Sequence, residues 1–301
     1  MPDWDPEVIV DAPLARRLIT DQFPELAAAP MRTLAAGWDN TVFVVDESWA
    51  FRFPRRAIAI PGVEREMRLL PALAERLPAP VPVPRFLGTP SAAFAWPFFG
   101  AGLLPGGEPT PGFDNAARTR LAPSLGRFLR ALHDTDPPAE LLHDPMGRVD
   151  MARRVPFASD RLGELAASGL ADHRAAAAGL LRAARDLPRS SRRATVHGDL
   201  HFRHVLVDGG GVDPLTGIID WGDLCRGDPA MDLHLAWSLL PADARPAFWA
   251  AYGPIEPEQA LRARVVGLYL GAVLALYGER EGLPAVRDEA LASVERVLIA
   301  Q

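Results

Sequence analysis

Two aspartates, Asp199 and Asp220, stand in short polar breaks beside two apolar runs. The runs at 205–207 and 217–219 are separated by a glycine-rich turn at 209–211, so this stretch predicts a β-hairpin. An acid just before the first strand and another at the end of the second strand come to one edge of such a hairpin. Carboxylates in that arrangement suit a divalent cation and a hydroxyl group that must lose a proton.

The first polar break also contains three histidines, His197, His201 and His204. Their spacing leaves a zinc site open as an alternative, because histidine is a common zinc ligand. Zinc ligands on a helix stand four residues apart on one face, whereas Gly198 and the β-type run after His204 argue against a helix here. We interpret His197 as a brace of the loop, and we assign no role to His201.

The order of these elements resembles one family of enzymes. The His-Gly-Asp motif at 197–199, with His204 five positions after the aspartate, resembles the catalytic loop of the aminoglycoside phosphotransferases. The sequence at 219–223 resembles that family's metal-binding motif, and 227–229 with Asp232 resembles its continuation. The resemblance implies an α+β, bilobal, protein-kinase-like fold. Its N-lobe would have an antiparallel sheet plus a helix, and its C-lobe would be mainly helical.

The resemblance also implies a reaction and its residues. The chain would move the γ-phosphate of ATP or GTP to a hydroxyl of a small molecule, first of all an aminoglycoside antibiotic. Asp199 would act as the base, while Asp220 and His204 would hold Mg²⁺. Mn²⁺ is an alternative, because His204 offers nitrogen where many kinases have an asparagine oxygen. Macrolide or small-metabolite kinases are the alternative enzymes, and a non-catalytic nucleotide-binding module is the alternative class.

The chain contains no lysine, because all 32 of its Lys and Arg residues are arginines. Arg52 stands where the resemblance expects the lysine of the third kinase strand. Strand alternation puts it on the face opposite Phe51 and Phe53. An arginine is always charged and can hold phosphate oxygens through two nitrogens. We therefore expect Arg52→Ala to weaken nucleotide use strongly and to leave the fold intact.

The same resemblance supplies the remaining nucleotide-site residues. Glu66, in a helical pattern over 61–77, would pair with Arg52, and Glu64 is its nearby competitor. The sequence at 33–45 predicts a strand, a turn and a second strand, and the turn would cover the nucleotide phosphates through Gly37, Asn40 and Thr41. We interpret Arg55, Arg56 and His133 as surface or helix-end residues, and Asp228 and Asp232 as acceptors that fix the catalytic loop.

The expected organisation is an N-lobe at 1–103 that binds nucleotide and a C-lobe at 104–301 that carries catalysis and the acceptor site. Apolar spacing predicts helices over much of the chain. These helices fall within 13–28, 61–77, 121–133, 159–187, 233–240, 245–252, 258–278 and 286–300.

The composition argues against a nucleic-acid-binding protein, a membrane protein and a secreted protein. A formal net charge of −6 argues against nucleic acid as a partner and suits a cationic acceptor, as do Glu256, Glu258, Glu279 and Glu281. We find no apolar run that predicts a membrane span, and the start is acidic without a signal-peptide pattern. The single cysteine, Cys225, allows no intrachain disulfide and indicates a cytoplasmic location. Nothing in the sequence indicates an oligomeric state.

Overall fold

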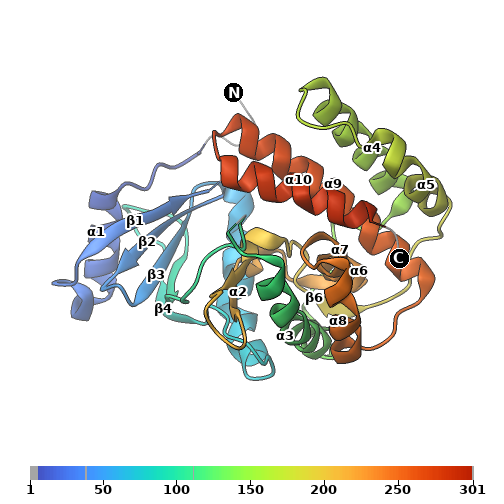
Figure 1. Cartoon of the computed structure of the whole chain (residues 1–301). Helices are drawn as coiled ribbons and strands as arrows, with labels where there is room; N and C mark the ends of the chain where they lie inside the picture. Colours follow the sequence, from blue (N-terminus) through green and yellow to red (C-terminus); the bar gives the residue numbers. More distant parts are fainter. Residues whose placement is uncertain (1–5, 38, 111, 300–301) are drawn as a thin grey trace. The chain divides into compact units, whose positions relative to one another are not determined.

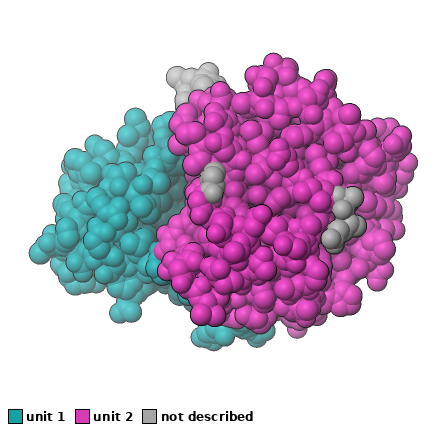
Figure 2. Space-filling model, in the orientation of Figure 1, with its two compact units in different colours: residues 1–76, 80–105, 218–224 teal, residues 77–79, 106–217, 225–301 magenta. Residues whose placement is uncertain are grey.

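The computed structural model describes residues 6–37, 39–110 and 112–299 (Figure 1). Contacts within the chain divide it into two compact units (Figure 2). Unit 1 consists of 1–76, 80–105 and 218–224, and unit 2 consists of 77–79, 106–217 and 225–301. The predicted lobes are continuous stretches, whereas each unit here combines several separate segments of the chain.

Unit 1 contains a five-stranded antiparallel sheet with the strand order β1-β2-β3-β5-β4. Among the described residues of unit 1, two α-helices and three short 3₁₀ helices accompany the sheet. The elements are α1 (Ala12–Gln22), η1 (Pro24–Leu26), β1 (Met31–Ala36), β2 (Asn40–Val45), β3 (Trp49–Pro54), η2 (Ala57–Ala59), α2 (Ile60–Ala74), β4 (Pro84–Gly88), β5 (Phe98–Gly102) and η4 (Trp221–Asp223).

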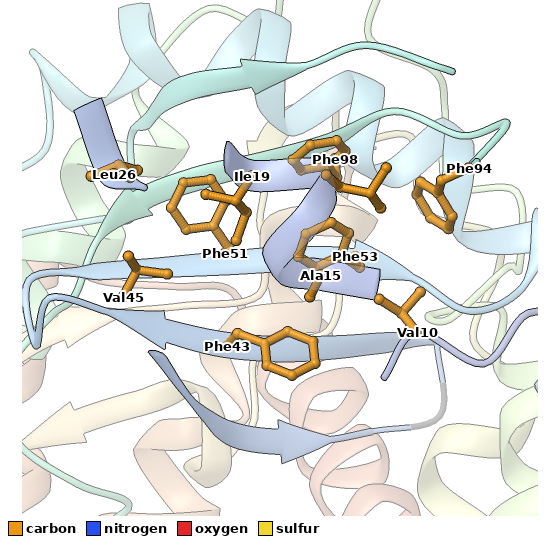
Figure 3. Packing of buried hydrophobic residues seen from close by; sticks show 11 residues of the cluster. Val10, Ala15, Ile19, Leu26, Phe43, Val45, Phe51, Phe53, Phe94 and Phe98 are labelled. Carbon is orange, nitrogen blue, oxygen red and sulfur yellow. The ribbon is translucent and has the colours of Figure 1, made fainter. Parts of the chain in front are cut away.

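One face of this sheet carries an aromatic core. Phe51 and Phe53 of β3 are fully buried and pack with Phe98 of β5, and Phe53 stacks on Phe98 at 4.5 Å between ring centroids. Ile19 of α1 packs into the same cluster (Figure 3). Successive strand residues face opposite sides, so Arg52 points to the other face. The alternation predicted for β3 is confirmed.

The opposite face packs against α2. Phe99 of β5 joins Val63 and Met67 of α2 in a second, smaller cluster. Pro61 lies in the first turn of α2, where its fixed φ favours helix and its missing N–H would have no helical partner. The cross-strand neighbours Arg52 and Phe99 are paired in the β3–β5 ladder. The sheet therefore holds Arg52 on the side of α2.

Unit 2 is mainly helical, with two small two-stranded sheets, β6-β9 and β7-β8. Strand β8 runs to Ile218, where the chain enters unit 1. The elements are α3 (Asn115–His133), α4 (Met151–Ala167), α5 (Arg174–Arg185), β6 (Ala194–Val196), η3 (Phe202–His204), β7 (Val205–Val207), β8 (Leu215–Ile218), β9 (Cys225–Gly227), α6 (Ala230–Leu233), α7 (Leu235–Ser238), η5 (Ala242–Ala244), α8 (Arg245–Tyr252), α9 (Pro257–Arg280) and α10 (Pro284–Leu298).

Local sequence explains where several helices begin. Asp11, Asp114 and Asp150 are the N-caps of α1, α3 and α4, and each side chain accepts a hydrogen bond from a backbone N–H of the first turn. Such a cap is typically worth about 1 kcal/mol. Within unit 2, the buried ion pair of Arg118 and Glu289, at 2.7 Å, connects α3 with α10.

The helix α9 is long and apolar enough to cross a membrane by length and composition alone. We expected no such segment from the sequence. However, 56% of its apolar window is buried inside the structure, where α9 packs against α4 and α10. Core helices of soluble proteins have the same properties, so this helix is weak evidence for a membrane span.

The predicted α+β organisation, with an antiparallel N-terminal sheet and a helical C-terminal part, is confirmed. The predicted hairpin at 205–219 is also present as β7 and β8, and the backbone N–H of Asp208 donates to the carbonyl oxygen of Pro214 at 2.9 Å near its turn.

Candidate active site

In unit 1, Arg52 lies between two carboxylates. Its Nη1 is 2.9 Å from Oε1 of Glu66, and its Nη2 is 2.7 Å from Oδ1 of Asp220. Glu66 is fully buried, whereas the Asp220 side chain is 43% exposed. Glu64, the competitor, is exposed. Three residues that are far apart in the sequence, from β3, α2 and the segment after β8, thus form one charged cluster.

Burial and mutual charge shift the pKa values of Arg52 and Glu66 in this cluster. Burial raises the pKa of Glu66 to about 7, and the positive charge of Arg52 only partly opposes this. Burial would lower the pKa of Arg52, but the charges of Asp220 and Glu66 outweigh burial and raise it. Arg52 therefore stays charged, and Glu66 is the member of the pair that can take up a proton near neutral pH.

The turn before β2 faces the same cluster. With its amide assigned from the hydrogen-bond network, the Asn40 side-chain oxygen accepts from Nε and Nη2 of Arg52, at 3.1 and 2.8 Å. The N–H of Gly37 donates to the carbonyl oxygen of Asn40 at 2.9 Å, so this N–H closes the turn itself. Thr41 is buried, with 7% exposure. Trp38, between these residues, lies outside the described part of the chain.

Two arginines that we interpreted as surface residues hold this turn. Nη1 of Arg55 donates to the carbonyl oxygen of Gly37 at 2.6 Å, and Nη1 of Arg56 pairs with Oδ1 of Asp39 at 3.0 Å. The strand register explains these contacts, because Asn40 pairs with Pro54 and the next residues must lie beside the turn. The pairing of the two strands across this turn is the feature of the sequence from which these contacts could be predicted.

Asp220 has an unusual backbone conformation. It adopts φ 65° and ψ 65°, the left-handed region that a residue with a Cβ seldom occupies. Its successor segment η4 packs on α2, where Arg65 donates through Nη1 to the carbonyl oxygen of Gly222. A Cβ on Gly62 would lie 3.0 Å from that same carbonyl oxygen, so the close approach favours glycine. Strained residues of this kind cluster at functional sites.

In unit 2, a buried carboxylate organises the loop that carries Asp199. Oδ2 of Asp232 accepts from the N–H of His197 at 2.8 Å, and its Oδ1 accepts from the N–H of Gly198 at 3.1 Å. Nε2 of His133 lies 3.1 Å from Oδ2 of the same aspartate. Burial alone would raise the pKa of Asp232, but the hydrogen bond and charge of His133, with those of His197, lower it. Asp232 is therefore an ionised anchor for the loop.

His133 differs from our interpretation of it as a helix-end or surface residue. It does end α3, but its side chain is only 4% exposed, and its Nδ1 lies 2.9 Å from the hydroxyl of Tyr252. The apolar residues of α3 recur at helical spacing up to Leu132, and this pattern could place His133 near the core. The sequence could not show which carboxylate it would meet.

Asp228, which we expected to fix the loop like Asp232, has different partners. Its carboxylate accepts from Ser190 and from the N–H of Ala230 and, at 3.3 Å, from Nε2 of Gln259. It therefore fixes the start of α6 and the segment before β6.

Further contacts fix the middle of the catalytic loop. Nε2 of the buried His234 donates to the carbonyl oxygen of Leu200 at 2.6 Å. Burial lowers the pKa of His234 to about 4, so it is neutral near pH 7. Arg203 pairs with Glu108 at 3.1 Å. The loop is thus attached to its unit on several sides.

The side chain of His204 lies close to Asp199 within this loop, so both residues can offer a ligand atom to the same metal ion. Nδ1 of His204 lies 2.8 Å from the backbone carbonyl oxygen of Asp199. A carbonyl oxygen can only accept, so Nδ1 carries the proton and Nε2 of the neutral ring carries the lone pair. Metal-binding histidines commonly donate their second nitrogen to a carbonyl in this way. His197, by contrast, is fully buried, and its backbone is used to brace the loop.

The structure brings together most of the predicted nucleotide residues in unit 1, and it brings together the loop residues Asp199 and His204 in unit 2. The two predicted metal ligands, Asp220 and His204, belong to different units. The donor chemistry of each fits a divalent cation: Asp220 presents a partly exposed carboxylate, and the tautomer of His204 presents a basic nitrogen.

A strand cation paired with a helix glutamate, as Arg52 is with Glu66, is a feature of protein kinases, where a lysine supplies the cation. Comparison with known sequences is consistent with a kinase-like phosphotransferase. Residues 30–264 match the phosphotransferase enzyme family (APH), which is more than half of the chain. The chain belongs to this family and is a phosphotransferase. None of the curated proteins matches the sequence significantly.

Solved structures show the same fold. An aminoglycoside 2'-phosphotransferase-IIIa in its GDP complex is 21% identical, with a TM-score of 0.70, covering 96% of this chain and 99% of that one. The complex of APH(2'')-IIIa with GDP and kanamycin is 21% identical, with a TM-score of 0.69 and coverage of 94% and 97%. Macrolide 2'-phosphotransferase MphH from Brachybacterium faecium is 24% identical, with a TM-score of 0.61 and coverage of 94% and 97%.

Proposed function

We propose that this protein transfers the γ-phosphate of ATP or GTP to a hydroxyl group of a small molecule, with an aminoglycoside as the first candidate acceptor. The observation that carries the proposal is the position of Arg52, whose guanidinium contacts both Glu66 and Asp220. In a chain without lysine, this is the cation available on β3 for the nucleotide phosphates.

Arg52 would bind the phosphate oxygens, and Glu66 would hold its guanidinium in position. Guanidinium groups bind phosphate through two parallel hydrogen bonds, which gives direction as well as charge. Asn40, which also contacts Arg52, supports this orientation. Catalysis of phosphoryl transfer rests mainly on such positioning and on charge neutralisation.

Asp199 would accept the proton of the acceptor hydroxyl as that oxygen attacks phosphorus. A positioned general base typically contributes ~10²–10⁴-fold. The Asp199 side chain is 37% exposed, so an acceptor can reach it. The bonds from Asp232 to the loop backbone keep this carboxylate in position while the acceptor binds and leaves.

Asp220 and His204 would hold Mg²⁺, with Mn²⁺ as the alternative that suits a nitrogen ligand. The bound cation would neutralise charge on the phosphate oxygens. Before nucleotide binds, Arg52 occupies one carboxylate oxygen of Asp220. We propose that Arg52 moves part of its contact from Asp220 to phosphate when nucleotide binds.

The acceptor class rests on the similar structures. Their names include complexes with kanamycin, gentamicin and streptomycin, and also macrolide 2'-phosphotransferases. The acidic C-terminal helices add less support than their composition suggested, because Glu279 pairs with Arg287 and Glu281 with Arg280. Macrolides are therefore the second candidate acceptors. The nucleotides named in these complexes include GDP, ADP and ATP, so both ATP and GTP remain candidates for this chain.

The experiment is a nucleotide-consumption assay with Mg²⁺. ATP and GTP are each tested against aminoglycosides, macrolides and simple amino alcohols, with Asp199→Ala as the matched control. We expect turnover that depends on an aminoglycoside and is lost in the control. Turnover with a macrolide or an amino alcohol alone would contradict the aminoglycoside assignment. Acceptor-dependent turnover that persists in the control would contradict the role of Asp199.

A cytoplasmic location and the absence of a nucleic-acid partner remain part of the proposal.

A further inference from the structure

The loop that carries Asp199 contains a compact group of three metal-binding side chains. One donor atom each from Asp199, His201 and His204 lies within 4.8 Å of the other two. Nε2 of His201 is 3.9 Å from Oδ2 of Asp199. His201 has no part in the proposed phosphoryl transfer, so its presence in this group needs a separate explanation.

A short 3₁₀ turn produces the group. The N–H of His204 donates to the carbonyl oxygen of His201 at 2.9 Å, at the start of η3. In a 3₁₀ turn, side chains three residues apart lie on the same side. The rings of His201 and His204 are accordingly 3.9 Å apart between centroids, with 30° between their planes. The 3₁₀ turn thus places His201 and His204 on one side of the chain, although the segment that follows His204 is a β-strand.

The ring of His204 and the loop backbone are also held in position before any ion arrives. The hydrogen bond from Nδ1 of His204 to the carbonyl oxygen of Asp199 leaves the lone pair of the neutral ring on Nε2. The loop is held by Asp232, and by His234 through Leu200. His201 is 11% exposed and Asp199 is 37% exposed, so one side of the group is open to solvent.

We propose that Asp199, His201 and His204 form a binding site for a transition-metal ion of the Zn²⁺ class. Two imidazole nitrogens and one carboxylate oxygen, with an open fourth position, are a donor set that Zn²⁺ and Co²⁺ favour. Mg²⁺ prefers oxygen ligands and near-octahedral geometry, so it binds this set less well. The site overlaps the predicted Mg²⁺ pair at His204, but it includes Asp199 and His201 and excludes Asp220.

Occupation of this site has a consequence that rests on the proposed function. A metal ion bound to the Asp199 carboxylate withdraws the group that would take the hydroxyl proton. It also takes the Nε2 of His204 away from any other cation. Ions of the Zn²⁺ class therefore inhibit phosphoryl transfer, even when Mg²⁺ and nucleotide are present in excess.

The test uses Co²⁺ alone as a spectroscopic probe of the full chain, without nucleotide or acceptor. We expect visible absorption bands of a low-coordinate Co²⁺ site that saturate at one ion per chain and disappear when Zn²⁺ is added. His201→Gln and, separately, His204→Gln should each weaken Co²⁺ binding by about 10-fold or more, since even outer-shell partners cost ~10–100-fold in metal affinity. His143→Gln, at an exposed histidine elsewhere in unit 2, is the control and should bind as the wild type does.

The absence of Co²⁺ bands in the wild type would overturn the proposal. Bands of unchanged strength in both histidine variants, with folding verified by circular dichroism, would overturn it as well. This titration contains no nucleotide, so its outcome does not depend on whether the phosphotransferase assignment is correct. Where turnover is measurable, His201→Gln should require at least about 10-fold more Zn²⁺ for the same inhibition, on the same ligand-loss argument. Equal Zn²⁺ sensitivity would overturn the inhibitory consequence.

Discussion

The ion pair of Arg52 with Glu66 makes a quantitative prediction about stability and pH. Glu66 is fully buried, and burial raises its pKa from 4.5 to about 7. This folded-state pKa lies above the unfolded value, so the contribution of Glu66 to stability is full below pH 4.5 and is lost as pH rises to about 7. The 2.5-unit difference corresponds to about 3 kcal/mol, at 1.36 kcal/mol per unit.

Replacing Arg52 by methionine removes the nearest positive charge that opposes this rise. The pKa of Glu66 in the variant then moves well above 7, and the variant continues to lose stability between pH 7 and 9 while the wild type does not. The destabilisation at pH 9 therefore exceeds that at pH 6, by about 1.4 kcal/mol for each pH unit between the wild-type and variant pKa values of Glu66. Breaking a buried ion pair typically costs about 3–5 kcal/mol, which is the largest difference we expect. The contact with Asp220 adds less, because that side chain is 43% exposed.

Urea unfolding of the wild type and of Arg52→Met at pH 6 and pH 9 measures this difference. The same substitution in a Glu66→Gln background is the matched control, and there the destabilisation should not change with pH. Arg56→Met, whose partner Asp39 is 44% exposed, should show a small effect at both values. A destabilisation by Arg52→Met that is equal at pH 6 and pH 9 would show that Arg52 does not hold down the pKa of Glu66.

Three further predictions concern unit 2. Gly106→Ala puts a Cβ 2.3 Å from the side-chain oxygen of Thr216, at a φ of +94° that favours glycine. We expect this substitution to lower the free energy of unfolding in urea by about 2 kcal/mol or more. Gly107 has open space around it, so the control Gly107→Ala should change that free energy by less than about 1 kcal/mol. Asp232→Asn weakens charge-assisted hydrogen bonds to the catalytic loop, worth about 1.5–3 kcal/mol each, so kcat should fall while nucleotide affinity measured by calorimetry stays near the wild-type value. His234, whose pKa burial lowers to about 4, contributes stability above pH 6.5 that is lost as pH falls to 4, and His234→Phe should flatten the acid limb of the stability–pH curve by up to about 3 kcal/mol.

The fold was largely predictable, because periodic apolar patterns and strand alternation locate most of its elements. The alternation around Arg52 correctly separated this residue from Phe51 and Phe53. The helix predicted over 245–252 agrees with the observed bounds of α8, Arg245–Tyr252. Pro24 marks the end of the first helix, as expected of a residue that breaks or kinks helices: α1 ends at Gln22, and Pro24 begins a separate 3₁₀ turn.

The candidate site was predictable only where a motif carried it. The pairing of Arg52 with Glu66 followed from the family resemblance, since no local pattern distinguishes Glu66 from Glu64. The role of Arg55 and Arg56 depends on strand register, which joins residues across a turn, and it was missed. The environment of His133 depends on a long-range contact with Asp232, 99 positions away, and sequence spacing does not record such contacts.

Arg52 and Asp199 have separate proposed roles, since Arg52 would bind the nucleotide and Asp199 would accept the proton. The most direct test measures both nucleotide affinity and the single-turnover rate of phosphate transfer in Arg52→Gln and Asp199→Asn, at pH 6.5 so that the stability cost of losing Arg52 stays small. We expect Asp199→Asn to keep its nucleotide affinity and to lose transfer by ~10²–10⁴-fold, the usual contribution of a general base, and we expect Arg52→Gln to lose nucleotide affinity. Transfer by Asp199→Asn at the wild-type rate, or wild-type nucleotide affinity in Arg52→Gln, would contradict these roles.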